Sequence, residues 1–133
     1  MGSLRFVMEQ KLNSQVFPAN FPPELAAKAF VHSGEAAWRP PLAVEAVEWL
    51  GTHGYAVLGT EVFLLVGDGI QSLPYFQSVK RREDEDWNSF APRSATETIN
   101  YLTAFTEELA QYGDVCISVT WMSESGLRDV RAR

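Results

Sequence analysis

The sequence predicts a single α+β domain, in which a small, mainly antiparallel sheet of about four strands has helices packed on one face. The expected elements run in the order helix, helix, strands, helix, strand, which lacks the strict strand–helix alternation of a parallel sheet. A length of 133 residues fits one domain. A composition of 46% hydrophobic and 21% charged residues is typical of globular proteins and excludes general disorder. We therefore treat residues 1–133 as one domain.

The first expected helix follows a proline. Pro23 suits the first turn of a helix, where a missing N–H costs nothing, so a short helix is expected over Glu24 to Val31. Ser33-Gly34 would end it. The segment before it, residues 1–21, fits either a strand or a helix and stays unassigned.

A second helix is expected from Pro40-Pro41 to about Leu50. Its outer face carries Glu45 and Glu48, and Gly51 and Gly54 would end it, because glycine adopts the left-handed conformation at little cost. Its inner face is an apolar stripe at helical spacing, formed by Leu42, Ala46, Trp49 and Leu50.

The middle of the chain has the pattern of a β hairpin. Tyr55 to Leu58 and the apolar run Glu61 to Val66 are strand-like, and the second of these is typical of a central strand. Gly67-Asp68-Gly69 favours a tight turn, after which Ile70 to Val79 returns as the partner strand. Pro74 lies inside that strand and indicates an edge position or a bulge.

A long helix and a last strand complete the prediction. Ser94 to Glu97 matches a capping box, and the helix is expected to continue to about Tyr112. Val115 to Trp121 alternates as a half-buried strand does, and residues 124–133 are expected to form a flexible tail. The apolar face of the helix is formed by Ile99, Leu102, Phe105, Leu109 and Tyr112.

The charge of the chain excludes some classes of partner. It has 17 acidic and 11 basic residues, a net charge of −6, which argues against binding to nucleic acid. The longest apolar stretch, Val62 to Val66, is too short to cross a membrane, and no secretory signal is seen near the N-terminus. A cytoplasmic location is therefore expected. The single cysteine cannot form an internal disulfide.

The sequence offers no catalytic set. His32 and His53 each lie beside a glycine at an expected helix end, where interaction with the helix dipole explains them. Cys116 lies in an alternating strand and is expected to be structural. Because no metal-ligand, phosphate-loop or nucleophile motif is present, we expect no catalytic residue, no metal site and no cofactor.

An acidic run is the sharpest polar feature. Glu83, Asp84, Glu85 and Asp86 follow three basic residues and precede Trp87. The run has three interpretations: a solvated loop, a docking patch for a basic protein, or a divalent-metal site. Trp87 would be either a core residue or an interface anchor, whereas Trp38 is expected in the core.

Several features together are similar to a known family. The segment Ala56 to Phe63 follows a helix containing Ala46 to Leu50 (AVEWL) and precedes a Gly-Asp-Gly turn, a charged stretch with a tryptophan, and a long helix. Over residues 40–121 the chain resembles small α+β immunity proteins of bacterial polymorphic toxin systems. The resemblance implies a cytosolic, non-catalytic antitoxin that binds a cognate toxin. Gly59, Glu61 and Trp87 are the family-like positions, and each would serve either the fold or toxin contact.

Three hypotheses follow, in order of preference. The first is a toxin inhibitor that binds a basic toxin through Glu61 and residues 83–87. A carboxylate such as Glu61 in an apolar strand needs a polar partner or a position at the sheet rim. The second is an intracellular protein-interaction domain unrelated to toxins. The third is a small metal-dependent enzyme that uses the acidic loop with His53.

Overall fold

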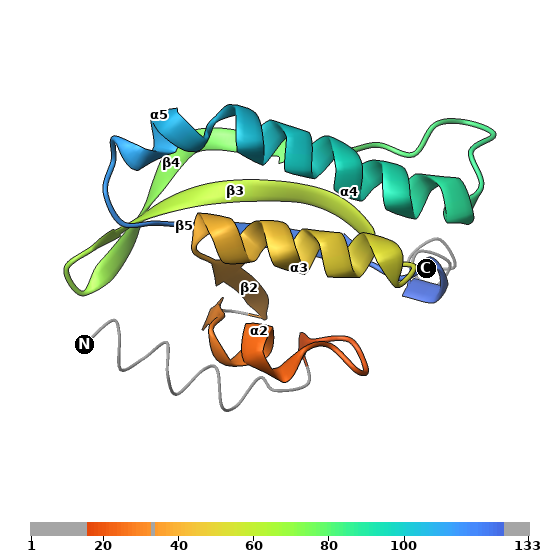
Figure 1. Ribbon diagram of the computed structural model, residues 1–133, viewed down its shortest axis with the longest axis horizontal. Helices are drawn as coiled ribbons and strands as arrows, with labels where there is room; N and C mark the ends of the chain where they lie inside the picture. The colour runs from red at the N-terminus through yellow and green to blue at the C-terminus, as the bar shows by residue number, and fades with distance from the viewer. Residues whose placement is uncertain (1–15, 33, 127–133) are drawn as a thin grey trace.

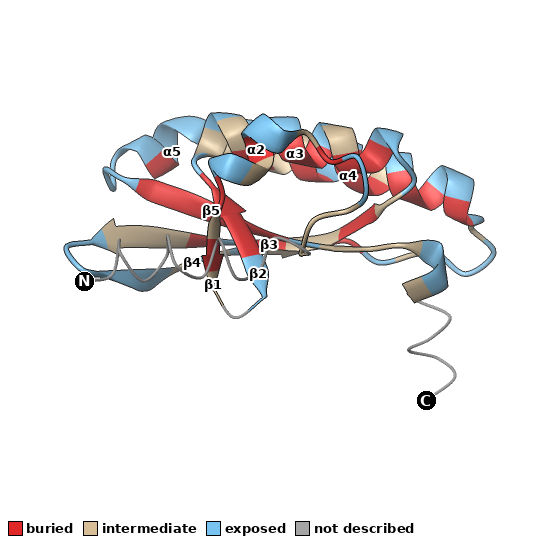
Figure 2. Cartoon of the chain, turned by 90° about the horizontal axis from the view of Figure 1, so that it is seen from below, coloured by how far each residue is buried: buried red, intermediate tan, exposed pale blue. Residues whose placement is uncertain are grey.

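The computed structural model describes residues 16–32 and 34–126, which form helices and one open antiparallel sheet (Figure 1). The sheet has five strands rather than four, in the order β1-β2-β5-β3-β4. Figure 2 shows the described helices on one side of it, so the α+β prediction is confirmed. The strands are β1 (Phe30–His32), β2 (Glu35–Trp38), β3 (Ala56–Val66), β4 (Gly69–Ser78) and β5 (Val115–Met122). The helices are α2 (Pro23–Ala27), α3 (Pro40–Thr52), α4 (Trp87–Ala104) and α5 (Thr106–Ala110).

The first hairpin, β1 and β2, was not predicted. The helix expected over Glu24 to Val31 ends at Ala27, and the chain then turns into a strand. Aromatic and β-branched residues favour strands, and here Phe30 and Val31 pair with β2. Gly34 has a φ of +79°, which allows the chain to reverse between the two strands.

The β3–β4 hairpin is confirmed, including its turn. β3 runs without a break from Ala56 to Val66, and β4 is an edge strand of the sheet. The pairing of the two strands slips between Glu61 and Phe63, opposite the segment of β4 that contains Pro74. Pro74 therefore lies both on an edge strand and at an irregularity, because it has no N–H to donate to a regular ladder.

The long helix begins earlier than the capping-box pattern indicated. α4 begins after Asp86, whose carboxylate accepts a hydrogen bond from the N–H of Ser89 at 2.8 Å. Ser94 lies inside the helix, where its hydroxyl accepts from the N–H of Val57 at 2.8 Å and joins α4 to β3. The helix expected to reach Tyr112 is also divided, since α4 ends at Ala104 and α5 follows.

The core lies between the helices and the sheet. Trp38 is fully buried, as expected, and its indole N–H donates to the carbonyl of Leu25 at 2.8 Å. Gly51 lies inside α3 and does not end it. A Cβ at Gly51 would lie 2.4 Å from the Cβ of Ala95 on α4, so this glycine allows the two helices to approach closely.

The last strand of the described residues, β5, is the central strand of the sheet. β5 pairs with β2 on one side and β3 on the other, and its residues from Val115 to Val119 are all buried. The prediction of a half-buried strand is therefore wrong for most of its length. In the expected tail, residues 124–126 form a helical turn; residues 127–133, like residues 1–15 of the unassigned N-terminal segment, lie outside the described residues.

Candidate functional site

The sheet has one face that no helix of the described residues covers (Figure 2). On it, Glu61 of β3 lies opposite Ser118 of β5 and Phe76 of β4. Residues directly opposite in an antiparallel pair point to the same face, so these three form a row across the sheet. A parallel row is formed by Thr120, Gly59 and Ser78. Glu61 is thus exposed on the sheet surface.

The two rows enclose a hollow of about 530 Å³. Small residues form much of its lining, whereas Glu35, Glu61 and Phe76 are exposed around it. The side chain of Phe76 is 75% exposed, the largest exposure among the described large hydrophobic residues. Among the described residues, no lysine, arginine or histidine lines the hollow. The surface therefore combines a solvated aromatic ring with negative charge.

Gly59 has a structural role in this hollow. The register of β3 against β5 shifts between Val57 and Gly59, which marks a bulge. A Cβ at Gly59 would lie 2.6 Å from the backbone oxygen of Gln77 on β4. Any side chain here would separate β3 from β4, so the close approach of the strands accounts for the glycine.

A polar network lies on the helix-facing side of the sheet, opposite the hollow, and joins β3 and β4 to α4. The hydroxyl of Thr60 donates to the side-chain oxygen of Gln77 at 3.3 Å, and the amide of Gln77 donates to Thr98 on α4 at 3.2 Å. These bonds hold Gln77 toward the helices. Because successive strand residues point to opposite faces, its neighbour Phe76 points toward solvent.

Glu85, one of the residues of the acidic run, joins the loop to α4. Its carboxylate accepts two hydrogen bonds from the guanidinium of Arg93 on α4, both at 2.7 Å, and one from the N–H of Arg82 at 3.0 Å. The pair is largely shielded, with the side chains of Arg93 and Glu85 19% and 9% exposed. These hydrogen bonds, that of Arg93 foremost, lower the pKa of Glu85 to about 2.

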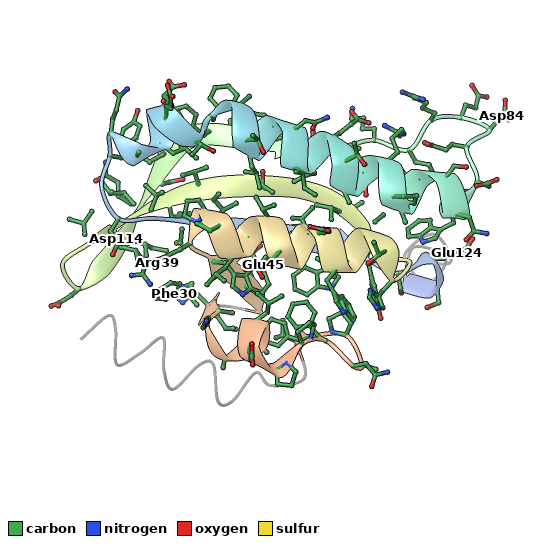
Figure 3. The ribbon with its side chains drawn as sticks, viewed as in Figure 1. Phe30, Arg39, Glu45, Asp84, Asp114 and Glu124 are labelled. Carbon is green, nitrogen blue, oxygen red and sulfur yellow. The ribbon has the colours of Figure 1, made fainter. Side chains whose placement is uncertain are left out.

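Asp86 and Trp87 are likewise engaged within the fold. Asp86 caps α4, and the indole N–H of Trp87 donates to the carbonyl of Gly54 at 2.7 Å. The side chain of Trp87 is 5% exposed, which agrees with a core residue and not with an interface anchor. Glu83 and Asp84 remain exposed on the outer part of the loop, as the label of Asp84 in Figure 3 shows.

The structure does not join the loop and Glu61 into one site. Residues 81–86 line a shallow depression of their own between β4 and α4, and none of them lines the hollow around Glu61. Partner binding by Glu83 to Asp86 stays a prediction. Phe76 was missed, although one signal was present in the sequence. Tyr75 and Phe76 are adjacent in a strand, so one aromatic ring must face away from the helices.

His53 and Cys116, two residues that could take part in catalysis, do not line the hollow, and both have contacts within the fold. The ring of His53 stacks on that of Trp49 with centroids 3.9 Å apart. Cys116 is buried, and burial raises the pKa of its thiol to about 11, which disfavours the reactive thiolate. Among residues 16–32 and 34–126, no group of three or more His, Cys, Asp or Glu side chains is placed to hold a metal ion.

Comparisons with protein families, with curated proteins and with solved structures give no match for this chain. Within the described ranges, no helix is both long and apolar enough to cross a membrane.

Proposed function

We propose that this chain is a non-catalytic binding protein that neutralises a cognate bacterial toxin, and that it binds the toxin through the hollow on the open sheet face. The observation that carries the proposal is Phe76, a solvated aromatic ring beside Glu61 in a hollow that no basic residue of the described ranges lines. Exposed aromatic residues are frequent anchors of protein interfaces. The resemblance over residues 40–121 supports a toxin as the partner and the cytoplasm as the place of action.

The charge around the hollow favours a basic toxin. Glu35 and Glu61 are both exposed there, and the chain as a whole carries a charge of −6. Negative rim charges steer a basic partner toward the surface and raise the rate of association. Phe76 would then supply most of the affinity by entering a pocket on the toxin.

The test is titration of the purified protein against the product of the neighbouring gene, with binding and toxin activity both measured. We expect a tight complex and loss of toxin activity. Phe76→Ser is expected to raise the dissociation constant by about 30-fold, because truncated hot spots cost about 2 kcal/mol or more. Glu61→Gln is expected to slow association and to weaken its dependence on salt.

The matched control is Glu107→Gln, an exposed carboxylate on α5 that does not line the hollow. It should leave binding unchanged. Full affinity in both Phe76→Ser and Glu61→Gln would overturn the assignment of the open face. Weakened binding in Glu83→Gln/Asp84→Asn would instead place contacts on the acidic loop.

The same surface suits a second hypothesis, an interaction domain whose partner is not a toxin. A complex that depends on Phe76 but changes no toxic activity would support that hypothesis. The absence of any complex or protection would overturn toxin neutralisation by this chain.

A further inference from the structure

A second groove lies on the helix side of the molecule, between α2 and α3. It has a volume of about 460 Å³. Five residues on one side of α3, spaced as helical neighbours, form one wall, and α2 with its flanking residues forms the other. Figure 3 shows Glu45 on the side of α3 that faces α2. The lining residues are Pro22, Glu24, Leu25, Lys28, Leu42, Glu45, Glu48, Trp49 and Thr52.

The groove has apolar walls and an acidic rim. Its apolar lining includes Leu42 and Trp49, both partly buried, and the described residues of its rim carry three carboxylates against one ammonium. Glu45 and Glu48 are exposed, and neither forms an ion pair with another described residue. The surface is thus complementary to a side chain that combines an aliphatic stem with a positive head group.

Trp49 is held in position before any ligand arrives. Its ring stacks on His53 with an interplanar angle of 11°, and the ring of Phe21 packs against it edge-on with centroids 5.1 Å apart. A fixed aromatic wall lowers the entropy lost on binding. A guanidinium stacks on such a wall and donates to neighbouring carboxylates in a planar fork, which an ammonium cannot do.

We propose that this groove binds an arginine side chain of an extended, basic segment in a partner protein. The aliphatic stem lies against Leu42, and the guanidinium stacks on Trp49 and reaches Glu45 and Glu48. The inference is independent of the proposed toxin neutralisation, because no described residue lines both the groove and the hollow on the open sheet face.

The test is NMR titration of the full chain with an acetylated and amidated pentapeptide that carries two arginines between glycines. The indole N–H signal of Trp49 is expected to shift. Those of Trp38 and Trp87 serve as internal controls, since each donates a hydrogen bond inside the fold. No shift of the Trp49 signal at millimolar peptide would overturn the proposal.

Variants of the rim make the test specific. Glu45→Gln/Glu48→Gln is expected to weaken peptide binding about tenfold, and Lys28→Gln to strengthen it, because removing the positive charge makes the rim more attractive to an arginine. Glu107→Gln/Glu124→Gln removes the same number of exposed charges away from the groove and should leave binding unchanged. Equal weakening by both double variants would contradict a specific site. Equal affinity for a lysine pentapeptide would contradict guanidinium recognition by Trp49.

Discussion

Replacing Gly51 with alanine is expected to lower the free energy of unfolding by about 2 kcal/mol. The added methyl would meet the Cβ of Ala95 at 2.4 Å, a separation that real Cβ atoms do not adopt, so α3 and α4 must move apart. Overpacking of this kind costs up to about 3 kcal/mol. The higher helix propensity of alanine returns at most about 1 kcal/mol, so the clash decides the sign. Urea denaturation of both chains at 25 °C measures the difference.

The matched control removes the methyl on the other helix. Ala95→Gly alone should destabilise modestly, through lower helix propensity and a small cavity. In Gly51→Ala/Ala95→Gly the methyl changes sides and the contact is restored. The double variant is therefore expected to be more stable than Gly51→Ala. Losses that simply add would contradict the close approach of Gly51 and Ala95.

Replacing Arg93 with methionine is expected to destabilise the protein at neutral pH and to change its response to acid. The guanidinium of Arg93 holds the carboxylates of Glu85 and Glu97 and the carbonyl of Lys80. Methionine keeps the aliphatic stem but leaves the shielded carboxylate of Glu85 without its strongest partner. The loop before α4 would lose its main connection to the helix.

The acid response has a definite sign. Binding to Arg93 lowers the pKa of Glu85 in the folded chain from 4.5 to about 2. The carboxylate therefore stabilises the fold fully above pH 4.5, and this contribution is lost as the pH falls from 4.5 toward 2. Urea denaturation across pH 2–7 should show this loss in the natural chain and a shallower slope in Arg93→Met.

Arg39→Met is the matched comparison. Arg39 also binds a carboxylate in two contacts, but this pair with Asp114 is half exposed, at 52% and 51%. Exposed pairs contribute little to stability. We expect Arg39→Met to destabilise the protein less than Arg93→Met does. Equal losses, or an unchanged acid slope in Arg93→Met, would contradict the role given to the shielded pair.

The elements with long, regular patterns could be predicted from the sequence. The stripe on α3 and the Gly-Asp-Gly hairpin depend on residues close in the chain, so local reasoning found them. β1 and β2 are three and four residues long, and their pairing depends on Trp38 and its neighbours meeting β5 far along the chain. That contact has no local signature. The local pattern around Ser94 matched a helix cap. The N–H of Val57, which donates to its hydroxyl, is distant in sequence, so the pattern could not reveal this bond.

The candidate site shows the same division. Glu61 in an apolar strand was expected at the sheet rim or beside a polar partner, but it lies exposed on the open face of β3, which is an inner strand. The acidic run allowed a solvated loop, a docking patch or a metal site, because a run of like residues does not reveal which carboxylates have partners. Glu85 forms an ion pair with Arg93 on α4, and Asp86 caps the same helix. The hollow itself arises from rows on three strands, which only the register of the sheet defines.

The position of β5 governs how this sheet can be assembled. The hairpins β1–β2 and β3–β4 each close over short distances in sequence, but neither pairs with the other. Each has an edge that is paired only by Val115–Met122, which follows both hairpins in the sequence and lies between them in the sheet. A chain that ended before this strand would carry two separate hairpins and a divided core. The order of the strands thus makes the joining of the two hairpins depend on contacts that are distant in sequence, a property that slows folding.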